Sequence, residues 1–208
     1  MKLLILGAGG HGRVVADAAI CSAQPWAEIA FLDDRYPALA RSGLWPVVGR
    51  FEELARFAGH YDACIAAVGD AGLRLRLLDR AAAAGFAISS VVHRGATLSE
   101  HAAVAPGSML AAGAVVSIGA IVARGCIINT GASVDHDCRL AEGVHVCPGA
   151  HLAGGVEIGA RTWFGIGAVA RQGVRIGADV TVGAGAVCLE DVRDGVVVSG
   201  VPARERPS

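Results

Sequence analysis

The stretch VAPGSM-LAAGAV-VSIGAI-VARGCI, residues 104–127, consists of hexapeptides that begin with a large apolar residue and carry glycine at the fourth position. The same period runs from Val92 to Val187 without insertion or deletion, and Ala170 is the only undersized first residue. Other residues replace the fourth-position glycine in a few repeats, at His101, Asp137, Arg161 and Asp179. The repeat therefore decides the fold of this half of the chain.

A period of six residues fits neither an α-helix nor a plain hairpin, but it fits short strands joined by corners at fixed intervals. A periodic glycine suits a corner that requires positive φ, and the apolar first residue fills the interior of each coil. The sequence therefore predicts a parallel β-helix. The period alone does not give the handedness, since crossovers between parallel strands are usually right-handed.

The chain begins with a different pattern. Lys2–Leu6 reads as a buried strand that runs into GAGGHG, residues 7–12, and a helical pattern follows from Arg13 to Cys21. Glycines spaced as GxGxxG between a strand and a helix place backbone N–H groups and a helix N-terminus on a phosphate. The same motif also occurs where a turn only packs a helix against a strand, so this alternative stays open.

Acidic residues follow the second predicted strand, Glu28–Leu32. Asp33 and Asp34 come about twenty residues after the glycine-rich turn, where an acidic side chain can accept ribose hydroxyls. The remaining predicted elements are a short helix Phe51–Phe57, a strand Ala63–Val68 before Gly69, a helix Leu73–Ala84 and a last strand Phe86–Val91. About four strands make half of a dinucleotide-binding fold, which favours a nucleotide-diphosphate sugar over NAD.

The change of pattern near residue 91 divides the 208 residues into two predicted domains. Residues 1–91 form a small Rossmann-like α/β domain, and residues 92–208 form the β-helix with a C-terminal tail. The formal net charge is −1, so we expect neither a nucleic acid nor a membrane surface as partner. The charge-free stretch Ala102–Ala123 is long enough to span a membrane, but its glycines stay in phase with the hexapeptide. We therefore expect it to form part of the β-helix.

The cysteines and the N-terminus bear on the compartment. None of the six cysteines has CxxC spacing, and Met1–Leu6 lacks the long apolar core of a signal peptide. Both observations predict a cytoplasmic protein with free thiols.

The β-helix carries one polar corner that suits proton transfer, Val134-Asp135-His136-Asp137-Cys138. A corner side chain points away from the coil interior, so we expect the imidazole of His136 to be exposed. Asp135 and Asp137 flank it and favour the protonated form that follows proton abstraction. A solvated polar corner without a catalytic role is the alternative, and it stays open.

Motifs along nearly the whole chain resemble the hexapeptide-repeat sugar acyltransferases, the family of bacillosamine and perosamine N-acetyltransferases and sialic acid O-acetyltransferases. The motifs are Gly7–Val15, Phe31–Asp34, Ala67–Gly69, Ile128–Gly131, Val134–Cys138, Ala153–Gly155 and Val198–Ala203. The resemblance implies a left-handed β-helix, a homotrimer, and N-acetylation of a nucleotide-linked 4-amino-4,6-dideoxy sugar by acetyl-CoA. O-acetylation of a sialic acid-type sugar stays open as an alternative.

The resemblance also implies roles for single residues. His136 matches the general base, Asp137 the residue that orients it, and His145 a contact to the thioester region of acetyl-CoA. The residues implied in nucleotide-sugar binding are Gly9, Gly10, His11, Asp33, Asp34 and Gly69, and those implied in contacts to the CoA arm are Gly154, Ile166 and Ala184. Relatives often carry glutamate beside the base, so whether Asp135 or Asp137 meets the imidazole stays open.

The chemistry needs few groups. A neutral sugar amine attacks a thioester directly while His136 takes its proton, so neither a metal nor an acyl-enzyme is required. Two other classes remain as alternatives: a zinc hydratase that resembles γ-class carbonic anhydrases, with His136, His145 and His151 as ligands, and a non-catalytic module that binds a nucleotide-sugar. The choice between UDP, GDP and CMP sugars stays open.

The expected trimer has a second line of support in the repeat. Several apolar residues are expected on the outer surface of the β-helix, namely Ala112, Ala114, Val115 and Ile121. An apolar surface of this kind points to burial between subunits.

Overall fold

The computed structural model describes residues 1–23 and 26–206. The chain forms two compact units, Met1–Arg94 and Gly95–Ser208. The predicted domain boundary after residue 91 falls inside β7 (Val91–Val92), the last strand of the first unit. Residues 207 and 208 of the predicted C-terminal tail lie outside the described residues.

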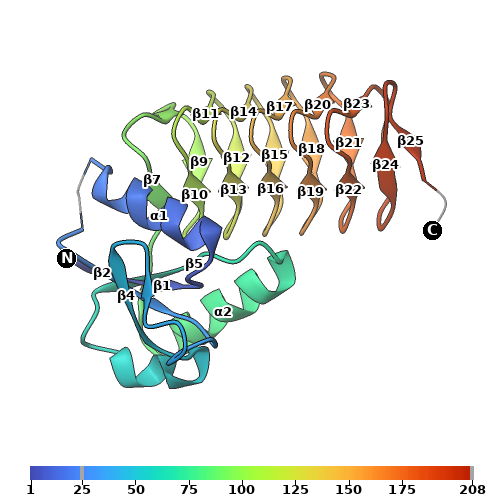
Figure 1. Ribbon diagram of the computed structural model, residues 1–208. Helices are drawn as coiled ribbons and strands as arrows, with labels where there is room; N and C mark the ends of the chain where they lie inside the picture. The colour runs from blue at the N-terminus through green and yellow to red at the C-terminus, as the bar shows by residue number, and fades with distance from the viewer. Residues whose placement is uncertain (24–25, 207–208) are drawn as a thin grey trace. The chain divides into compact units, whose positions relative to one another are not determined.

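The first unit is a sheet with the strand order β3-β4-β2-β1-β5-β6. Its elements are β1 (Lys2–Leu6), α1 (Gly10–Ile20), β2 (Glu28–Leu32), β3 (Arg41–Ser42), β4 (Trp45–Gly49), the 3-10 helix η1 (Phe51–Phe57), β5 (Ala63–Ala66), α2 (Ala71–Ala83) and β6 (Ala87–Ile88). The β1-α1-β2 and β5-α2-β6 connections step in opposite directions across the sheet. Right-handed crossovers therefore place the two helices on opposite faces (Figure 1).

The strands β1, β2 and β5 run parallel and supply the core of this unit. Leu4 and Leu6 of β1 are fully buried and pack in one cluster with Leu75 and Leu78 of α2. Each buried leucine contributes about 1.5–3 kcal/mol relative to an exposed one. This cluster fixes α2 against the sheet and so fixes the segment that precedes α2.

Three details differ from the sequence-based prediction. The helices begin earlier, at Gly10 and Ala71, and α2 starts there because the carboxylate of Asp70 accepts the Leu73 N–H at 2.5 Å as an N-cap. The predicted last strand is split into β6 and β7. The hairpin of β3 and β4 was not predicted, because β3 has two residues and Pro46 interrupts the apolar pattern of β4.

The second unit is the predicted left-handed β-helix, built mainly from two-residue strands that stack in three sheets (Figure 1). All strands but the last run parallel. One sheet contains β10 (Met109–Leu110), β13 (Ile127–Ile128), β16 (His145–Val146), β19 (Trp163–Phe164), β22 (Thr181–Val182), β24 (Val197–Ser199) and the antiparallel β25 (Arg204–Glu205). The second contains β8 (Thr97–Leu98), β11 (Val115–Val116), β14 (Ser133–Val134), β17 (His151–Leu152), β20 (Val169–Ala170) and β23 (Val187–Cys188). The third contains β9 (Ala103–Val104), β12 (Ile121–Val122), β15 (Arg139–Leu140), β18 (Glu157–Ile158) and β21 (Arg175–Ile176).

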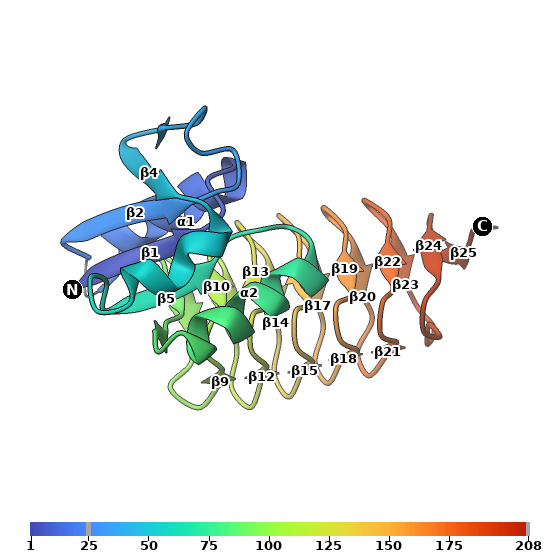
Figure 2. The same cartoon turned by 90° about the horizontal axis from the view of Figure 1, so that it is seen from below.

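The register shows that one coil is three hexapeptides long. Ile127 pairs with Met109 in the preceding coil and with His145 in the following coil. From β8 to β23, each strand residue therefore lies beside the equivalent residue of the next coil. Figure 2 shows the stacked coils from below. Side chains that are far apart in the sequence become neighbours along one corner or one face.

Three of the four corners in which another residue replaces glycine keep the predicted positive φ, whereas His101 does not. Asp137, Arg161 and Asp179 have φ values of 59°, 60° and 54°. This left-handed region costs a residue with a side chain roughly 1–2 kcal/mol, so each of these positions needs a compensating contact. Arg161 and Asp179 supply one to each other, because the guanidinium lies 2.7 Å and 2.5 Å from the carboxylate oxygens.

The coil interior is apolar from Leu110 onward, whereas Leu98 in the first coil is 39% exposed. Ala114 is fully buried, so its predicted place on the outer surface is wrong: it fills the small fifth position inside the coil. The charge-free residues 102–123 form β9 to β12. Across the described residues, no helix is both long enough and apolar enough to cross a membrane.

Candidate functional site

The first candidate site lies at the carboxyl edge of the sheet in the first unit. Parallel strands end at the same edge, and β1 is the central strand between β2 and β5. The Gly7 N–H donates to the Leu32 carbonyl at 2.8 Å, and the Ala67 N–H donates to the Leu6 carbonyl at 2.7 Å. The glycine-rich turn and the segments that follow β2 and β5 are therefore neighbours, as predicted.

The glycines of the turn have two different functions. Gly7 has φ 112°, and a Cβ atom at Gly12 would overlap the Gly7 carbonyl, so these two let α1 lie against β1. Gly9 is the N-cap of α1 and Gly10 is its first residue. A Cβ atom at Gly9 or Gly10 would meet nothing within 4 Å, as also at Gly69. The helix N-terminus is therefore open on this side, where an anion is favoured.

Asp33 is buried and stabilises the glycine-rich turn through hydrogen bonds of its carboxylate. Its residue is 7% exposed, and Oδ2 accepts the Ala8 N–H at 2.8 Å. The Arg35 guanidinium donates to Oδ1 at 2.7 Å and to Oδ2 at 2.8 Å. These hydrogen bonds, the one with Arg35 above all, lower the pKa of Asp33 to about 2. Both carboxylate oxygens are thus engaged by the protein itself.

Asp34 is the acid that remains accessible. It is exposed, and its Oδ1 accepts the Phe51 N–H at 3.1 Å. It lines a hollow of about 260 Å³ together with Arg50 and Arg80. The two arginines make this hollow suitable for an anionic or polyhydroxylated ligand.

His11 is neutral at physiological pH. Burial and the nearby charge of Arg74 lower its pKa to about 4. Arg74 is fully buried and donates to the carbonyl oxygens of Val68 and Gly69 at 2.9 Å and 3.0 Å. These bonds hold the segment after β5 at the edge where His11 lies in the first turn of α1.

The second candidate site is the polar corner of the β-helix. His136 Nδ1 lies 2.9 Å from Asp137 Oδ2, and the His136 backbone N–H donates to Asp135 Oδ1 at 2.8 Å. Asp137 is therefore the residue that meets the imidazole. The hydrogen bond to Asp137, with the charges of both acids, raises the pKa of His136 above its usual value. With Nδ1 held by a carboxylate, Nε2 is the nitrogen that can take a proton.

The neighbouring coils leave room for this pair. A Cβ atom at Gly119 would meet Asp137 Oδ1, and a Cβ atom at Gly154 would overlap the His136 ring at Nε2 and Cε1. These glycines are the positions one coil before Asp137 and one coil after His136. The orientation of the imidazole thus depends on the absence of a side chain at Gly154.

His145 is held in one tautomer. The Thr130 N–H donates to Asn129 Oδ1 at 2.8 Å, which turns the amide nitrogen of Asn129 toward His145 Nε2 at 3.1 Å. Nε2 must then accept, so the proton of the neutral ring sits on Nδ1. The ring is buried and packs edge to face on Trp163, with 4.4 Å between the ring centroids. His145 is therefore arranged as a hydrogen-bond donor and not as a base.

The residues implied for the CoA arm lie along two corners. Gly154 is half-buried, whereas Ile166 is 59% exposed and Ala184 is exposed. A hollow of about 790 Å³ lies elsewhere, along β15, β18, β21 and residues 191–194. None of the predicted site residues lines it.

Two alternative chemistries find no support. Burial raises the pKa of Cys138 and raises that of Cys147 to about 12, so neither thiol near the histidines is an activated nucleophile. His151 Nδ1 lies 2.8 Å from the Ser133 hydroxyl. Within the described ranges, His136, His145 and His151 do not gather as three ligands for one ion. The zinc hydratase alternative is therefore not supported.

The sequence reasoning gave no role to Arg35, Arg74 or Asn129. Arg74 had a usable signal, because it falls on the same helical face as the buried Leu77, Leu78 and Ala81. An arginine on an apolar face needs internal acceptors. Arg35 and Asn129 had no comparable signal: the contact of Arg35 with Asp33 is local but depends on rotamers, and that of Asn129 with His145 joins two coils.

Comparisons with known proteins show which family the chain belongs to. A family described as the PglD N-terminal domain matches residues 2–81. The acetyltransferase domain of PglB from Neisseria gonorrhoeae FA1090, solved with acetyl coenzyme A, is 41% identical, with 99% of this chain and 98% of that chain covered and a TM-score of 0.94. PerB from Caulobacter crescentus, solved with CoA and GDP-perosamine, is 35% identical, with 100% and 98% covered and a TM-score of 0.94.

WeeI from Acinetobacter baumannii AYE shares the fold, with 23% identity, 99% of this chain and 100% of that chain covered, and a TM-score of 0.80. No curated protein sequence gave a significant match. The fold and the polar corner define the chain as an acyltransferase of the hexapeptide-repeat class. Within that class, it belongs to the sugar acyltransferase family that contains PglB and PerB.

Proposed function

We propose that this protein transfers the acetyl group of acetyl-CoA to the amino group of a nucleotide-linked 4-amino-4,6-dideoxy sugar. The observation that carries the proposal is the exposed pair of His136 and Asp137, in which Nδ1 is 2.9 Å from the carboxylate. The similarity to a protein solved with acetyl coenzyme A and to another solved with CoA and GDP-perosamine supports the choice of substrates.

In the proposed reaction, His136 is the general base. The sugar amine attacks the thioester carbonyl, and Nε2 of His136 takes the amine proton as the C–N bond forms. Asp137 orients the ring through Nδ1 and stabilises the imidazolium. The C–S bond then breaks and CoA leaves as the thiol, with the proton that it needs returned by the imidazolium. The amide product and free CoA account for all atoms, and neither a metal nor a covalent intermediate enters.

His145 takes a different part in this scheme. We propose only that it contacts the thioester region of acetyl-CoA, with its ring orientation fixed by Asn129. A backbone N–H of a neighbouring corner is the donor proposed for the thioester oxygen as negative charge develops there. Gly154, Ile166 and Ala184 are proposed to contact the CoA arm.

The first unit is proposed to bind the nucleotide-sugar. The open N-terminus of α1 at Gly9 and Gly10 receives a phosphate, while Asp34 and His11 contact hydroxyl or base groups. Asp33 acts indirectly by holding the Ala8 N–H and Arg35. The open edge at Gly69 leaves space for the ligand.

A homotrimer is part of the proposal. The β-helix exposes large apolar side chains, namely Ile118 at 56%, Ile121 at 42%, Trp163 at 41% and Ile166 at 59%. Exposed groups of this size point to burial between subunits. Sedimentation that shows a stable monomer at micromolar concentration would contradict the trimer. All six cysteines are free, which supports a reducing compartment such as the cytoplasm.

The test measures thiol release from acetyl-CoA with GDP-, UDP- and CMP-linked sugars, each with an amine or a hydroxyl at the acceptor position. We expect release only with an amino sugar, and mass spectrometry should show one acetyl group on its nitrogen. His136→Ala should fold and lose about 10²–10⁴-fold in kcat with little change in KM. Retention of more than about a tenth of kcat would mean that the proton leaves by another route.

A further inference from the structure

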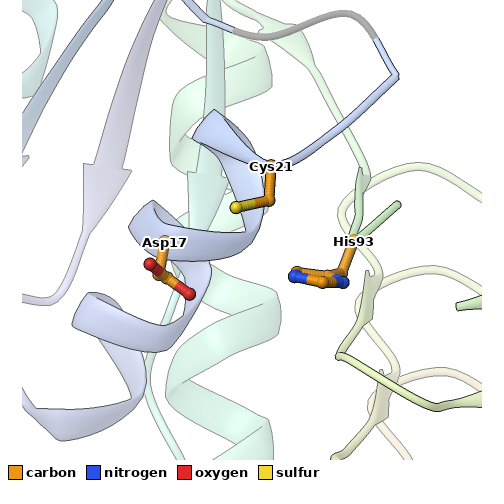
Figure 3. Close-up of side chains that lie close together, drawn as sticks. All are labelled: Asp17, Cys21 and His93. Carbon is orange, nitrogen blue, oxygen red and sulfur yellow. The ribbon is translucent and has the colours of Figure 1, made fainter. Parts of the chain in front are cut away.

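A second group of reactive side chains lies in the first unit, apart from the residues that the proposed reaction uses. Asp17 and Cys21 stand on one side of α1, and the ring of His93 faces them from the chain after β7 (Figure 3). A carboxylate oxygen, the cysteine sulfur and a ring nitrogen all lie within 4.8 Å of one another. In residues 1–23 and 26–206, no other three His, Cys, Asp or Glu side chains come together in this way.

We propose that Asp17, Cys21 and His93 bind one divalent metal ion of the zinc type. A thiolate, an imidazole and a carboxylate are the donors that Zn²⁺ takes, whereas Mg²⁺ and Ca²⁺ prefer oxygen donors alone. Three protein donors leave the fourth tetrahedral position to water. Around a tetrahedral ion these donors would be roughly 3.4–3.5 Å apart. Side-chain rotations that move the donor atoms by about 1 Å would therefore close the site.

The backbone holds the three donors in place before an ion binds. Asp17 and Cys21 are four residues apart on the helix and therefore share a face. The Cys21 N–H donates to the Asp17 carbonyl at 3.1 Å, and the Cys21 carbonyl accepts the Arg94 N–H at 3.0 Å. The second bond ties the end of α1 to the residue beside His93. Ion binding would therefore order only three side chains and no backbone.

The C-terminal end of α1 favours a cation. Cys21 is the C-cap of α1, where the partial negative charge of the helix C-terminus lies. The last turn of α1 has no basic side chain, whereas that of α2 has Arg80. Access is also favourable, since Cys21 is partly exposed while the other five cysteines are buried. Among the six cysteine thiols, that of Cys21 is therefore the one that an ion from solution can reach.

The ion would clamp the end of α1 to the chain after β7. Binding releases the Cys21 thiol proton to solvent and leaves the sulfur as a metal-bound thiolate, so no oxidant or reductant takes part. The α1 helix also carries the glycine-rich turn at its other end. The ion therefore stabilises the unit and takes no part in acyl transfer.

The experiment titrates Co²⁺ into the untagged full-length protein after treatment with a chelator. We expect one equivalent per chain, with a thiolate-to-cobalt charge-transfer band that Zn²⁺ removes by displacement. Cys21→Ser should abolish the band, and His93→Ala or Asp17→Asn should weaken binding at least as much as the about 10–100-fold loss of an outer-shell partner. His101→Ala, an exposed histidine of the β-helix, is the matched control and should bind as the wild type does.

A second measurement covers variants that fold poorly. Zn²⁺ should raise the Tm of the wild type and of His101→Ala, but not that of Cys21→Ser. The proposal is overturned if the wild type gives no thiolate band in excess Co²⁺, which would leave an ordinary polar cluster, or if Cys21→Ser keeps the band. Acetyl transfer is a separate readout, so loss of activity in His136→Ala has no bearing on this result.

Discussion

Gly154 leaves the space that the His136 imidazole fills, since a Cβ atom at residue 154 would overlap Nε2 of that ring. The two residues are one coil apart, and the ring lies over the glycine because its other nitrogen is held by Asp137. The proposed base is therefore positioned by a hydrogen bond on one side and by a missing side chain on the other.

Gly154→Ala should displace the imidazole while the fold is kept, because Gly154 does not have positive φ. A misplacement of about 1 Å can cost about 10²-fold in rate, so we expect a loss of kcat of that order. The neighbouring Gly155→Ala is the matched control. Gly155 has φ 69° and its Cβ would meet nothing, so this change should lower the Tm and keep kcat. Equal kcat values for the two variants would contradict the positioning role.

The acid limb of the kcat/KM profile should lie above the ordinary histidine pKa of about 6.5, because the hydrogen bond to Asp137 raises the pKa of His136. A general base must be neutral, so the rate should rise as pH increases through that value. Asp137→Asn removes the charge and should move the limb to lower pH while it lowers kcat. The sugar amine titrates equally in both enzymes, so the difference between the profiles isolates His136. If the acid limb of the profile were unchanged in Asp137→Asn, it would not report the titration of His136 beside Asp137.

The stability change has the opposite sign to the activity change at Asp137. The φ of 59° at Asp137 destabilises the folded state by roughly 1–2 kcal/mol, and glycine would remove this strain. Glycine also destabilises the folded state by about 0.5–1 kcal/mol, because it has more conformational freedom in the unfolded chain. Asp137→Gly should therefore raise the free energy of unfolding by about 0.5–1 kcal/mol per subunit and reduce kcat. Asp179→Gly relieves the same conformation, loses the ion pair with Arg161 and should keep kcat. Urea unfolding and steady-state kinetics on both variants check this pair of signs.

Substitution of Asp33 should lower the stability of the protein, whereas substitution of Asp34 should weaken the binding of the nucleotide-sugar. The folded-state pKa of Asp33 is about 2 against an ordinary value of 3.8, so its stabilisation is present above 3.8 and is lost as pH falls through about 2. That shift corresponds to about 2 kcal/mol. Asp33→Asn should lower the free energy of unfolding by about this amount at pH 7, with a smaller difference from the wild type near pH 3.

Asp34→Asn should leave stability nearly unchanged and raise KM for the nucleotide-sugar, because the amide oxygen can still accept the Phe51 N–H. Affinity for acetyl-CoA should stay the same in both variants. If the Asp34→Asn enzyme kept the wild-type KM for every nucleotide-sugar, Asp34 would not be part of the binding site.

The β-helix and the polar corner could be predicted from the sequence because the repeat makes position along the chain equivalent to position on a face. His136 and Asp137 meet within two consecutive residues, so no long-range contact had to be known. The engagement of Asp33 by Arg35 and of His145 by Asn129 was not predictable in this way. The first contact is local but depends on side-chain rotamers that the sequence pattern does not give, and the second joins neighbouring coils.

The division between Asp33 and Asp34 shows the same limit. Both acids follow a strand at the expected distance from the glycine-rich turn, and the pattern does not distinguish them. Burial does, since Asp33 is 7% exposed and holds the Ala8 N–H. Ala114 was misplaced for a related reason, because a small residue beside a corner glycine fits either the interior or the surface.

The register of three hexapeptides per coil also limits how this chain can change in length. Loss or gain of one hexapeptide between Gly119 and Asp137, or between His136 and Gly154, would turn every later side chain onto the next face of the triangle relative to the coils before it. Asp137 would then no longer lie over Gly119, or the imidazole would no longer lie over Gly154. Loss or gain of a whole coil would keep each side chain on its own face and shift it only along the axis. Insertions that keep each side chain on its own face are therefore expected to come in whole coils, that is, in multiples of three repeats.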